Sequence, residues 1–176
     1  ERVAFWDAKL ANLGAGLKIG ISWRGGVPRT RHTFRSIPLH EWAPLLQLED
    51  CVFVSLQYGD SEKEIAGLAP QSGTGLTCWP EALDNYSETA ALVSALDLVI
   101  SVCTSVVHLA GALGKPAWVM VPAASEWRYL RSGSAMPWYP SVRLFRRQRA
   151  DPWQPVIAEV APELAWLARG RPCRRT

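Results

Sequence analysis

The chain has 176 residues, enough for one domain, and a domain of this size buries roughly 70% of the surface of the unfolded chain. Its content of 48% hydrophobic and 20% charged residues excludes a disordered or collagen-like protein. The formal net charge of +3 is too small to indicate a nucleic-acid partner, so we expect none.

Six short apolar runs that alternate with helical patterns are predicted to be strands. Such alternation is typical of a parallel sheet whose strands are joined by crossover helices. The strands are expected at residues 17–23, 51–56, 76–79, 98–102, 117–121 and 142–145. The predicted fold class is therefore α/β, a doubly wound and mostly parallel sheet. In such a sheet, ligands bind at the carboxyl ends of the strands.

Helices are predicted around and between these runs. Residues 1–16 are expected to form a linker helix, and Pro38 is expected in the first turn of the next helix, where a missing amide proton costs nothing. Ser61 and Ser87 are predicted to cap two further helices. The last two helices are expected at residues 104–113 and 155–167. We expect residues 17–168 to form one domain and residues 169–176 a basic tail.

Neither the ends of the chain nor its cysteines indicate secretion. The chain begins with Glu1 and no leader follows, so we expect it to be part of a longer protein. Its longest apolar runs, 90–100 and 117–122, are shorter than the roughly 18 residues of a membrane span, which predicts no span. The four cysteines form no CxxC pair, which argues against a zinc ribbon. Reduced thiols and a cytoplasmic location are the simplest expectation, although a disulfide stays formally possible.

The turn after the run 98–102 is the sharpest candidate site. Thr104 and Ser105 open a helix there, and the free amides at a helix N-terminus suit a phosphate or pyrophosphate. His108 lies within reach of the same place. The alternative is purely structural: a hydroxyl that only caps the helix, and a histidine that is satisfied within it.

A second candidate is the arginine-rich loop at residues 24–37. Gly25 and Gly26 allow a tight turn or a close approach to a ligand, and arginines grip phosphates with two donors at once. The loop is neither a Walker loop nor a GxGxxG motif. Arg35 is the arginine that we place at a ligand, and we expect most of the others to lie in solvent.

Two aromatic clusters have two open interpretations. They are Trp127-Arg128-Tyr129 and Pro137-Trp138-Tyr139-Pro140. Their rings suit either a platform for a base or sugar ring, or the packing of a long loop onto the sheet.

Taken together, these segments resemble the carboxyl-terminal half of heptosyltransferase-like glycosyltransferases, as found in bacterial tetratricopeptide-repeat proteins. The resemblance covers nearly the whole chain in order. It rests on seven motifs: Ile-Ser-Trp, Arg-Ser-Ile-Pro-Leu, Val-Ser-Leu-Gln, Glu-Thr-Ala-Ala-Leu-Val-Ser-Ala-Leu-Asp-Leu-Val-Ile-Ser-Val, Thr-Ser-Val-Val-His-Leu-Ala-Gly-Ala-Leu-Gly-Lys-Pro, Trp-Arg-Tyr-Leu and Pro-Trp-Tyr-Pro-Ser-Val-Arg-Leu-Phe-Arg. The matching segments are residues 21–23, 35–39, 54–57, 88–102, 104–116, 127–130 and 137–146.

The resemblance implies one Rossmann-like half of a GT-B fold, which binds a nucleotide-diphosphate sugar as donor for an inverting glycosyl transfer. It implies that neither a metal nor a cofactor is needed. The partners implied in the same protein are the amino-terminal transferase half and tetratricopeptide repeats, and the acceptor is a glycan or a protein. The catalytic base is expected in the missing half, so this chain alone is expected to bind without turnover.

The resemblance also assigns roles to single residues. By position, Thr104, Ser105 and His108 would hold the pyrophosphate and Arg35 would neutralise the phosphates. The residues expected near the nucleoside are Gln57 or Asp60.

Cys103 departs from the family pattern. Many members carry an aspartate at this position, placed to contact the donor sugar, and a thiol is a poor acceptor.

Three hypotheses follow. The chain is the donor-binding half of an inverting transferase, or a non-catalytic binding or scaffold domain, or an unrelated enzyme whose Cys103 is activated by the helix N-terminus.

Overall fold

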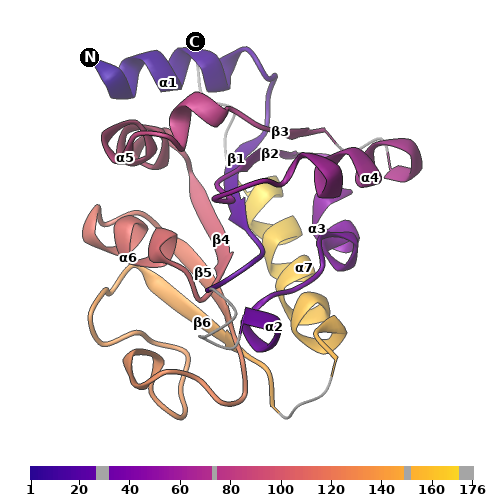
Figure 1. Ribbon diagram of the computed structural model, residues 1–176, viewed down its shortest axis with the longest axis vertical. Helices are drawn as coiled ribbons and strands as arrows, with labels where there is room; N and C mark the ends of the chain where they lie inside the picture. Colours follow the sequence, from indigo (N-terminus) through magenta and orange to yellow (C-terminus); the bar gives the residue numbers. More distant parts are fainter. Residues whose placement is uncertain (27–31, 73–74, 149–151, 171–176) are drawn as a thin grey trace.

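The computed structural model describes residues 1–26, 32–72, 75–148 and 152–170. Its centre is a six-stranded sheet in which all neighbouring strands run parallel (Figure 1). The strand order is β3-β2-β1-β4-β5-β6. The strands are β1 (Leu17–Ser22), β2 (Cys51–Ser55), β3 (Leu76–Thr77), β4 (Leu98–Val102), β5 (Ala117–Val121) and β6 (Val142–Arg146). The predicted α/β class, with a doubly wound and mostly parallel sheet, is confirmed.

The burial of the strands explains why these apolar runs form the sheet. All residues of β1 and β4 are buried, as expected for central strands covered on both faces. The edge strand β3 is shorter than the predicted run, because only Leu76 and Thr77 pair with β2. Both residues are half-buried.

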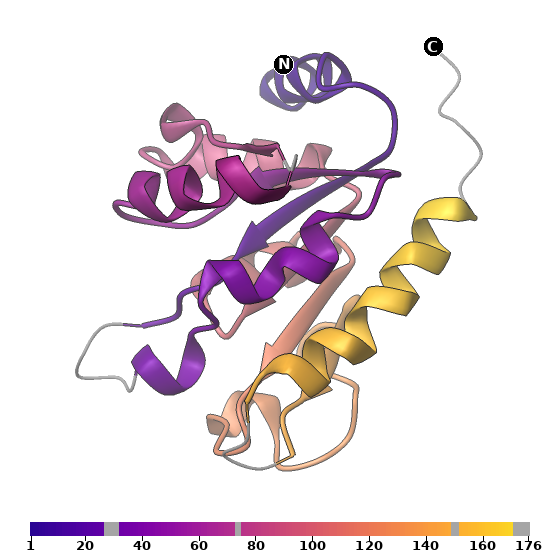
Figure 2. The ribbon, with the colours of Figure 1, turned by 90° about the vertical axis from the view of Figure 1, so that its right-hand side faces the viewer.

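Helices cover both faces of the sheet. One face carries α1 (Arg2–Ala11), α5 (Tyr86–Ala95) and α6 (Ser105–Ala112), and the other carries α3 (Ala43–Leu46), α4 (Glu62–Ser72) and α7 (Gln154–Arg169), which Figure 2 views from the α3 and α7 side. The remaining helical turns are α2 (His32–Arg35), η2 (Leu39–Trp42), η3 (Pro80–Ala82) and η4 (Trp127–Tyr129). Within the described residues, no helix is both long enough and apolar enough to cross a membrane.

Two details of the predicted helices were wrong. The helix expected after Pro38 is split into the 3-10 turn η2 and the α-helical turn α3. Pro44 lies at the junction and has no amide proton to donate to the preceding turn. The cap of α5 is Asn85 rather than Ser87, because Asn85 takes the extended conformation of an N-cap and accepts from the Ser87 amide at 2.9 Å.

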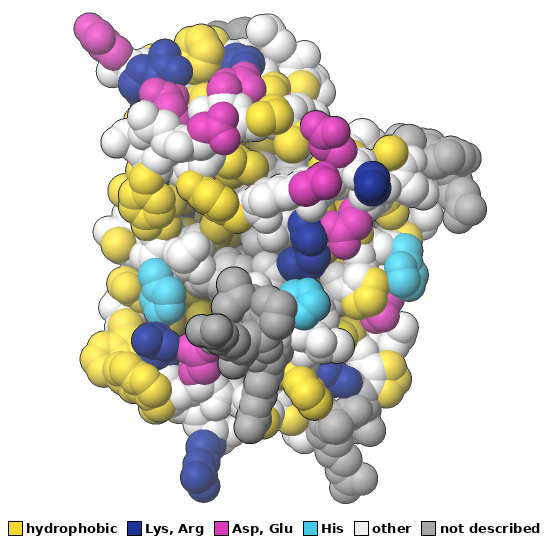
Figure 3. Space-filling model, viewed as in Figure 1, with side chains coloured by type: hydrophobic (Ala, Val, Ile, Leu, Met, Phe, Trp, Pro, Cys, Tyr) yellow, Lys and Arg dark blue, Asp and Glu magenta, His cyan; other side chains and the backbone are white. Residues whose placement is uncertain are grey.

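The first helix packs against the domain. Trp6 of α1 is fully buried, and its indole nitrogen donates to Glu88 of α5 at 2.9 Å. Arg2 pairs with the same carboxylate, and Lys9 pairs with Glu81. On the face seen in Figure 3, acidic and basic side chains therefore alternate over α1 and α5 instead of forming a basic patch. Of the predicted basic tail, residues 171–176 lie outside the described residues.

Candidate functional site

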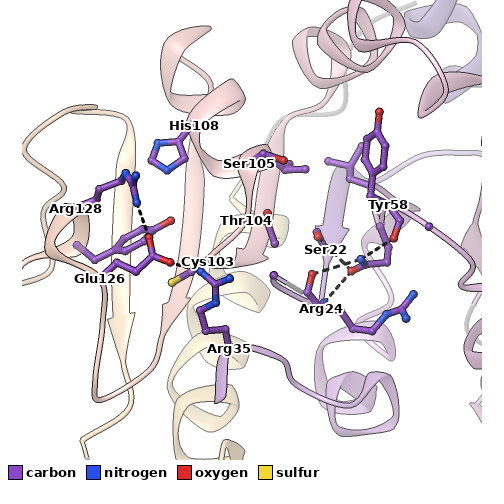
Figure 4. A pocket seen from close by; sticks show the side chains of 16 residues that line it. Ser22, Arg24, Arg35, Tyr58, Cys103, Thr104, Ser105, His108, Glu126 and Arg128 are labelled. Carbon is purple, nitrogen blue, oxygen red and sulfur yellow. Dashed lines mark hydrogen bonds and ion pairs between the residues drawn. The ribbon is translucent and has the colours of Figure 1, made fainter. Parts of the chain in front are cut away.

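A cavity of about 690 Å³ opens at the carboxyl ends of β1, β2, β4 and β5. This is the edge of the sheet where the strand order reverses between β1 and β4, so it is the expected ligand crevice of a doubly wound fold. Figure 4 shows the loops that meet there. The lining side chains discussed below are Ser22, Arg24, Arg35, Gln57, Tyr58, Cys103, Thr104, Ser105, His108, Glu126, Arg128 and Tyr129.

The N-terminus of α6 faces this cavity. Thr104 is the N-cap residue, but its hydroxyl bonds with the Ser101 hydroxyl at 3.0 Å instead of capping the helix. Among the described residues, no acceptor bonds to the amides of Ser105 and Val106. Two backbone donors, the exposed Ser105 hydroxyl and the positive end of the helix dipole are thereby directed at one place, which suits an anion.

Cys103 lines the cavity as a buried thiol. Its side chain is only 5% exposed and contacts the Tyr129 hydroxyl. Burial raises the pKa of the thiol to about 12, which outweighs the lowering effects of the Tyr129 hydrogen bond and the nearby arginines. The hypothesis of a thiol activated by the helix N-terminus is therefore wrong.

His108 is half-buried on α6, between two tyrosine rings. Its ring centroid lies 6.3 Å from that of Tyr129 and 5.8 Å from that of Tyr139. Burial, and then the charge of Arg128, lower its pKa below the ordinary value. His108 is therefore a neutral imidazole at pH 7, able to donate a hydrogen bond to a ligand without carrying a charge.

The aromatic clusters divide between packing and exposure. Tyr129 is buried, and Tyr139 packs so closely on α6 that a methyl group added at Gly111 would overlap its ring. Trp127 and Trp138 are exposed and meet edge to face, with centroids 5.7 Å apart. The packing interpretation thus fits the tyrosines, while the two tryptophans extend outward beside the cavity.

Arg35 reaches the cavity from α2, but it is already paired. Its guanidinium binds Glu126 Oε1, and Arg128 Nη1 binds Glu126 Oε2 at 2.5 Å. The three side chains come from two loops, after β1 and after β5, and meet beside the Cys103 turn in Figure 4. Glu126 was missed by the sequence prediction, because a lone glutamate in a loop carries no local signal that it will meet an arginine 91 positions away.

The glycine pair of the arginine-rich loop serves backbone packing. A methyl group at Gly25 would lie 2.9 Å from the carbonyl oxygen of Cys103. Gly26 has φ of 81°, a left-handed conformation that favours glycine. The close approach is thus to the Cys103 turn. Arg29 and Arg31 lie outside the described residues.

Gln57 is buried at the end of β2 and ties the first two strand ends together. Its Oε1 accepts from the amides of Trp23 and Arg24, at 3.0 and 2.8 Å, and from the Ser22 hydroxyl at 3.3 Å. Its Nε2 donates to the Tyr58 carbonyl oxygen at 3.1 Å. The side chain therefore acts as a structural clamp.

Asp60 lies beside the cavity rather than in its lining. Its carbonyl oxygen accepts from Arg24 Nη2 at 2.6 Å, and its Oδ1 accepts from the Glu62 amide at 3.3 Å. The exposed ring of Tyr58 lines the cavity instead. Sequence analysis did not single out Tyr58, which lies two residues after the predicted strand 51–56.

The arrangement can bind an anion through backbone amides, hydroxyls, a neutral imidazole and arginines. Within the described residues, no group of three or more His, Cys, Asp or Glu side chains could hold a metal ion. Thr104, Ser105, His108, Arg35 and Gln57 all line the same cavity.

No protein-family model matches the chain. Protein FlbA of Caulobacter vibrioides is 40% identical over 167 residues, which cover 93% of this chain and 27% of FlbA. This chain thus spans about a quarter of that relative's length.

Solved transferases share the architecture. The structure of E. coli ADP-heptose LPS heptosyltransferase II matches with a TM-score of 0.65 at 14% identity, over 94% of this chain and 51% of that one. A glycosyl transferase family 9 structure from Veillonella parvula matches with a TM-score of 0.61 at 11% identity, over 93% and 52%. The chain has a glycosyltransferase-like Rossmann fold. It spans about half the length of these solved transferases, and at these identities the likeness establishes the fold alone.

Proposed function

We propose that this chain is the donor-binding half of an inverting glycosyltransferase and binds a nucleotide-diphosphate sugar in the cavity. The observation that carries the proposal is the open N-terminus of α6, with Thr104 and Ser105, at the point where the strand order reverses. The solved transferases with this fold include E. coli heptosyltransferase WaaC with bound ADP, at a TM-score of 0.60.

The residues around the cavity suit the stabilisation of a departing nucleoside diphosphate. A departing nucleoside diphosphate gains negative charge in the transition state, and preorganised donors stabilise that charge most in a site shielded from water. The amides of Ser105 and Val106 are fixed by the helix, and Arg35 is held at the cavity wall. His108, neutral at pH 7, donates a hydrogen bond to a phosphate oxygen.

The base that activates the acceptor is proposed to lie in the other half of the transferase, carried by the same protein. The acceptor is a glycan or a protein. The proposal further places residues 17–168 as the donor domain of a longer cytoplasmic protein with tetratricopeptide repeats. FlbA, of which this chain spans 27%, is long enough to hold such further domains.

A second candidate is a non-catalytic binding or scaffold domain of the same fold. Two observations favour it. Cys103 presents a protonated, buried thiol where many heptosyltransferases carry an aspartate for the donor sugar. The arginine expected at the phosphates is paired with Glu126. Both features weaken recognition of a sugar nucleotide without altering the fold.

Calorimetric titration with uridine, adenosine and guanosine diphosphates and their sugars separates the two candidates. The donor proposal expects binding of one base with a preference for its sugar nucleotide. Arg35→Ala is expected to weaken binding by about 1.5–3 kcal/mol, the usual worth of a hydrogen bond to a charged group. The matched control is Arg143→Ala, which removes an exposed arginine paired with Glu163 outside the cavity lining. No binding of any nucleoside diphosphate at millimolar concentration would leave only the scaffold.

A further inference from the structure

Two arginines of the cavity converge on one internal carboxylate. Arg35 lies on α2 after β1, and Arg128 lies in η4 after β5. They bind different oxygens of Glu126, which is therefore held between two guanidinium groups (Figure 4). Guanidinium groups bind carboxylate and phosphate with the same planar donor geometry. The carboxylate thus occupies a position that would equally suit a phosphate.

The three side chains differ in how easily they can leave this arrangement. The Arg35 side chain is 14% exposed, whereas those of Glu126 and Arg128 are 36% and 43% exposed. Glu126 sits at the loop position just before η4, where only its own side chain must turn outward to reach water. Exchange of Glu126 for another anion therefore needs no movement of Arg35.

The balance of charge in the cavity depends on Glu126. Among the described lining residues, Glu126 is the sole carboxylate, and the guanidinium groups are those of Arg24, Arg35 and Arg128. Arg24 is neutralised from outside the lining by Glu64, at 3.1 Å. Removing Glu126 takes away the carboxylate that the described residues place between Arg35 and Arg128, so small anions of any kind would be attracted there more strongly, since charge pairs gain strength where water is partly excluded.

We propose that Glu126 is an internal counterion that a diphosphate displaces, so that the cavity rejects single phosphates and selects diphosphates. This inference rests on the proposed function of the cavity. A single phosphate group carries about 1.5 to 2 negative charges at pH 7, and it must displace a carboxylate that already binds both arginines. A diphosphate keeps a second phosphate group for the free amides of Ser105 and Val106.

A purely structural ion pair makes the opposite prediction. If Glu126 served only to hold Arg35 in position, its removal would loosen that guanidinium and weaken the binding of every anion. If a diphosphate displaces Glu126, removal of the Glu126 carboxylate should strengthen the binding of both anions. The binding of a single phosphate should be strengthened more than that of a diphosphate.

Titration calorimetry with inorganic phosphate and inorganic pyrophosphate at constant ionic strength tests the inference. Glu126→Gln is expected to bind phosphate at least about ten-fold more tightly than the wild type does, a gain of about 1.4 kcal/mol. The affinity for pyrophosphate should rise less, so the ratio of the pyrophosphate affinity to the phosphate affinity should decrease. Glu126→Asp, whose shorter carboxylate spans the two arginines less well, should lie between. Circular dichroism on both variants checks that they are folded.

The matched control is Glu64→Gln, which makes the same change of charge beside the cavity but removes the ion pair of Arg24 alone, and whose amide oxygen can still accept from Trp23 Nε1. It should change either affinity less than about three-fold, because the Asp60 carbonyl still holds Arg24. Equal gains in phosphate affinity in Glu126→Gln and Glu64→Gln, or a loss of affinity in Glu126→Gln, would overturn the inference while leaving the proposed function intact. If only Glu126→Gln bound pyrophosphate, Glu126 would exclude diphosphates as well as single phosphates, and both displacement and the donor role of the native chain would be refuted. If neither the wild type nor Glu126→Gln bound it, both proposals would fail.

Discussion

Among the polar side chains of the site, Gln57 is expected to contribute most to the stability of the fold. Gln57→Leu keeps the volume of the side chain but leaves the amides of Trp23 and Arg24 without their acceptor. Each buried donor left unsatisfied costs about 1–3 kcal/mol. Leucine returns about 1 kcal/mol through its apolar surface. We therefore expect the free energy of unfolding to fall by about 1–5 kcal/mol.

Urea denaturation followed by tryptophan fluorescence measures this loss. The control is Gln47→Leu, the same chemical change at an exposed position, which should alter the free energy of unfolding by less than about 0.5 kcal/mol. A loss below about 1 kcal/mol for Gln57→Leu would refute the clamp. Unchanged stability together with weaker nucleotide binding would instead restore Gln57 to the ligand contact that the resemblance implies.

Three further predictions concern single residues. Leu130 has φ of 57°, so Leu130→Gly should raise the free energy of unfolding by about 1 kcal/mol, and a loss in urea denaturation would contradict strain there. Cys103 should resist iodoacetamide at pH 8 until the protein unfolds, because a pKa of about 12 leaves about one thiol in ten thousand ionised; rapid labelling in peptide mass maps would exclude this. Because the pKa of His108 is lowered by folding, the unfolded state binds more protons below about pH 6.5, and stability falls as the pH decreases through that range. His108→Gln should reduce that fall between pH 7 and 5, whereas an identical pH profile would show that His108 is not the group concerned.

The strands and the doubly wound α/β class could be predicted from the sequence because buried parallel strands leave a local signal. The runs that became β1, β4 and β5 are mostly apolar, and each ends at or near a hydroxyl residue or a proline. The edge strand β3 was overestimated, because its length depends on pairing with β2 and not on its own composition. The split of the helix after Pro38 depended on Pro44, whose effect on the preceding turn was overlooked.

The candidate site was only partly predictable, for a different reason. Thr104, Ser105 and His108 lie within one strand-turn-helix segment, so their proximity follows from local sequence. Glu126 meets Arg35 only through the fold, and Gln57 satisfies amides on a neighbouring strand. Such long-range partners carry no local pattern. The chemical state of Cys103 was misjudged because burial, which raises its pKa, outweighs the helix N-terminus.

The central claim is that the N-terminus of α6 binds the diphosphate of a ligand. The most direct measurement is a ¹⁵N-edited NMR titration of the folded chain with inorganic pyrophosphate, in which each backbone amide reports separately. The account predicts saturable chemical-shift changes that are largest at Ser105 and Val106. In Arg35→Ala, the half-maximal change should require a higher concentration of pyrophosphate. Amides of α7, on the far side of the sheet from α6, should stay unchanged. An unperturbed Ser105 and Val106 at millimolar pyrophosphate, or shifts confined to other elements, would contradict it.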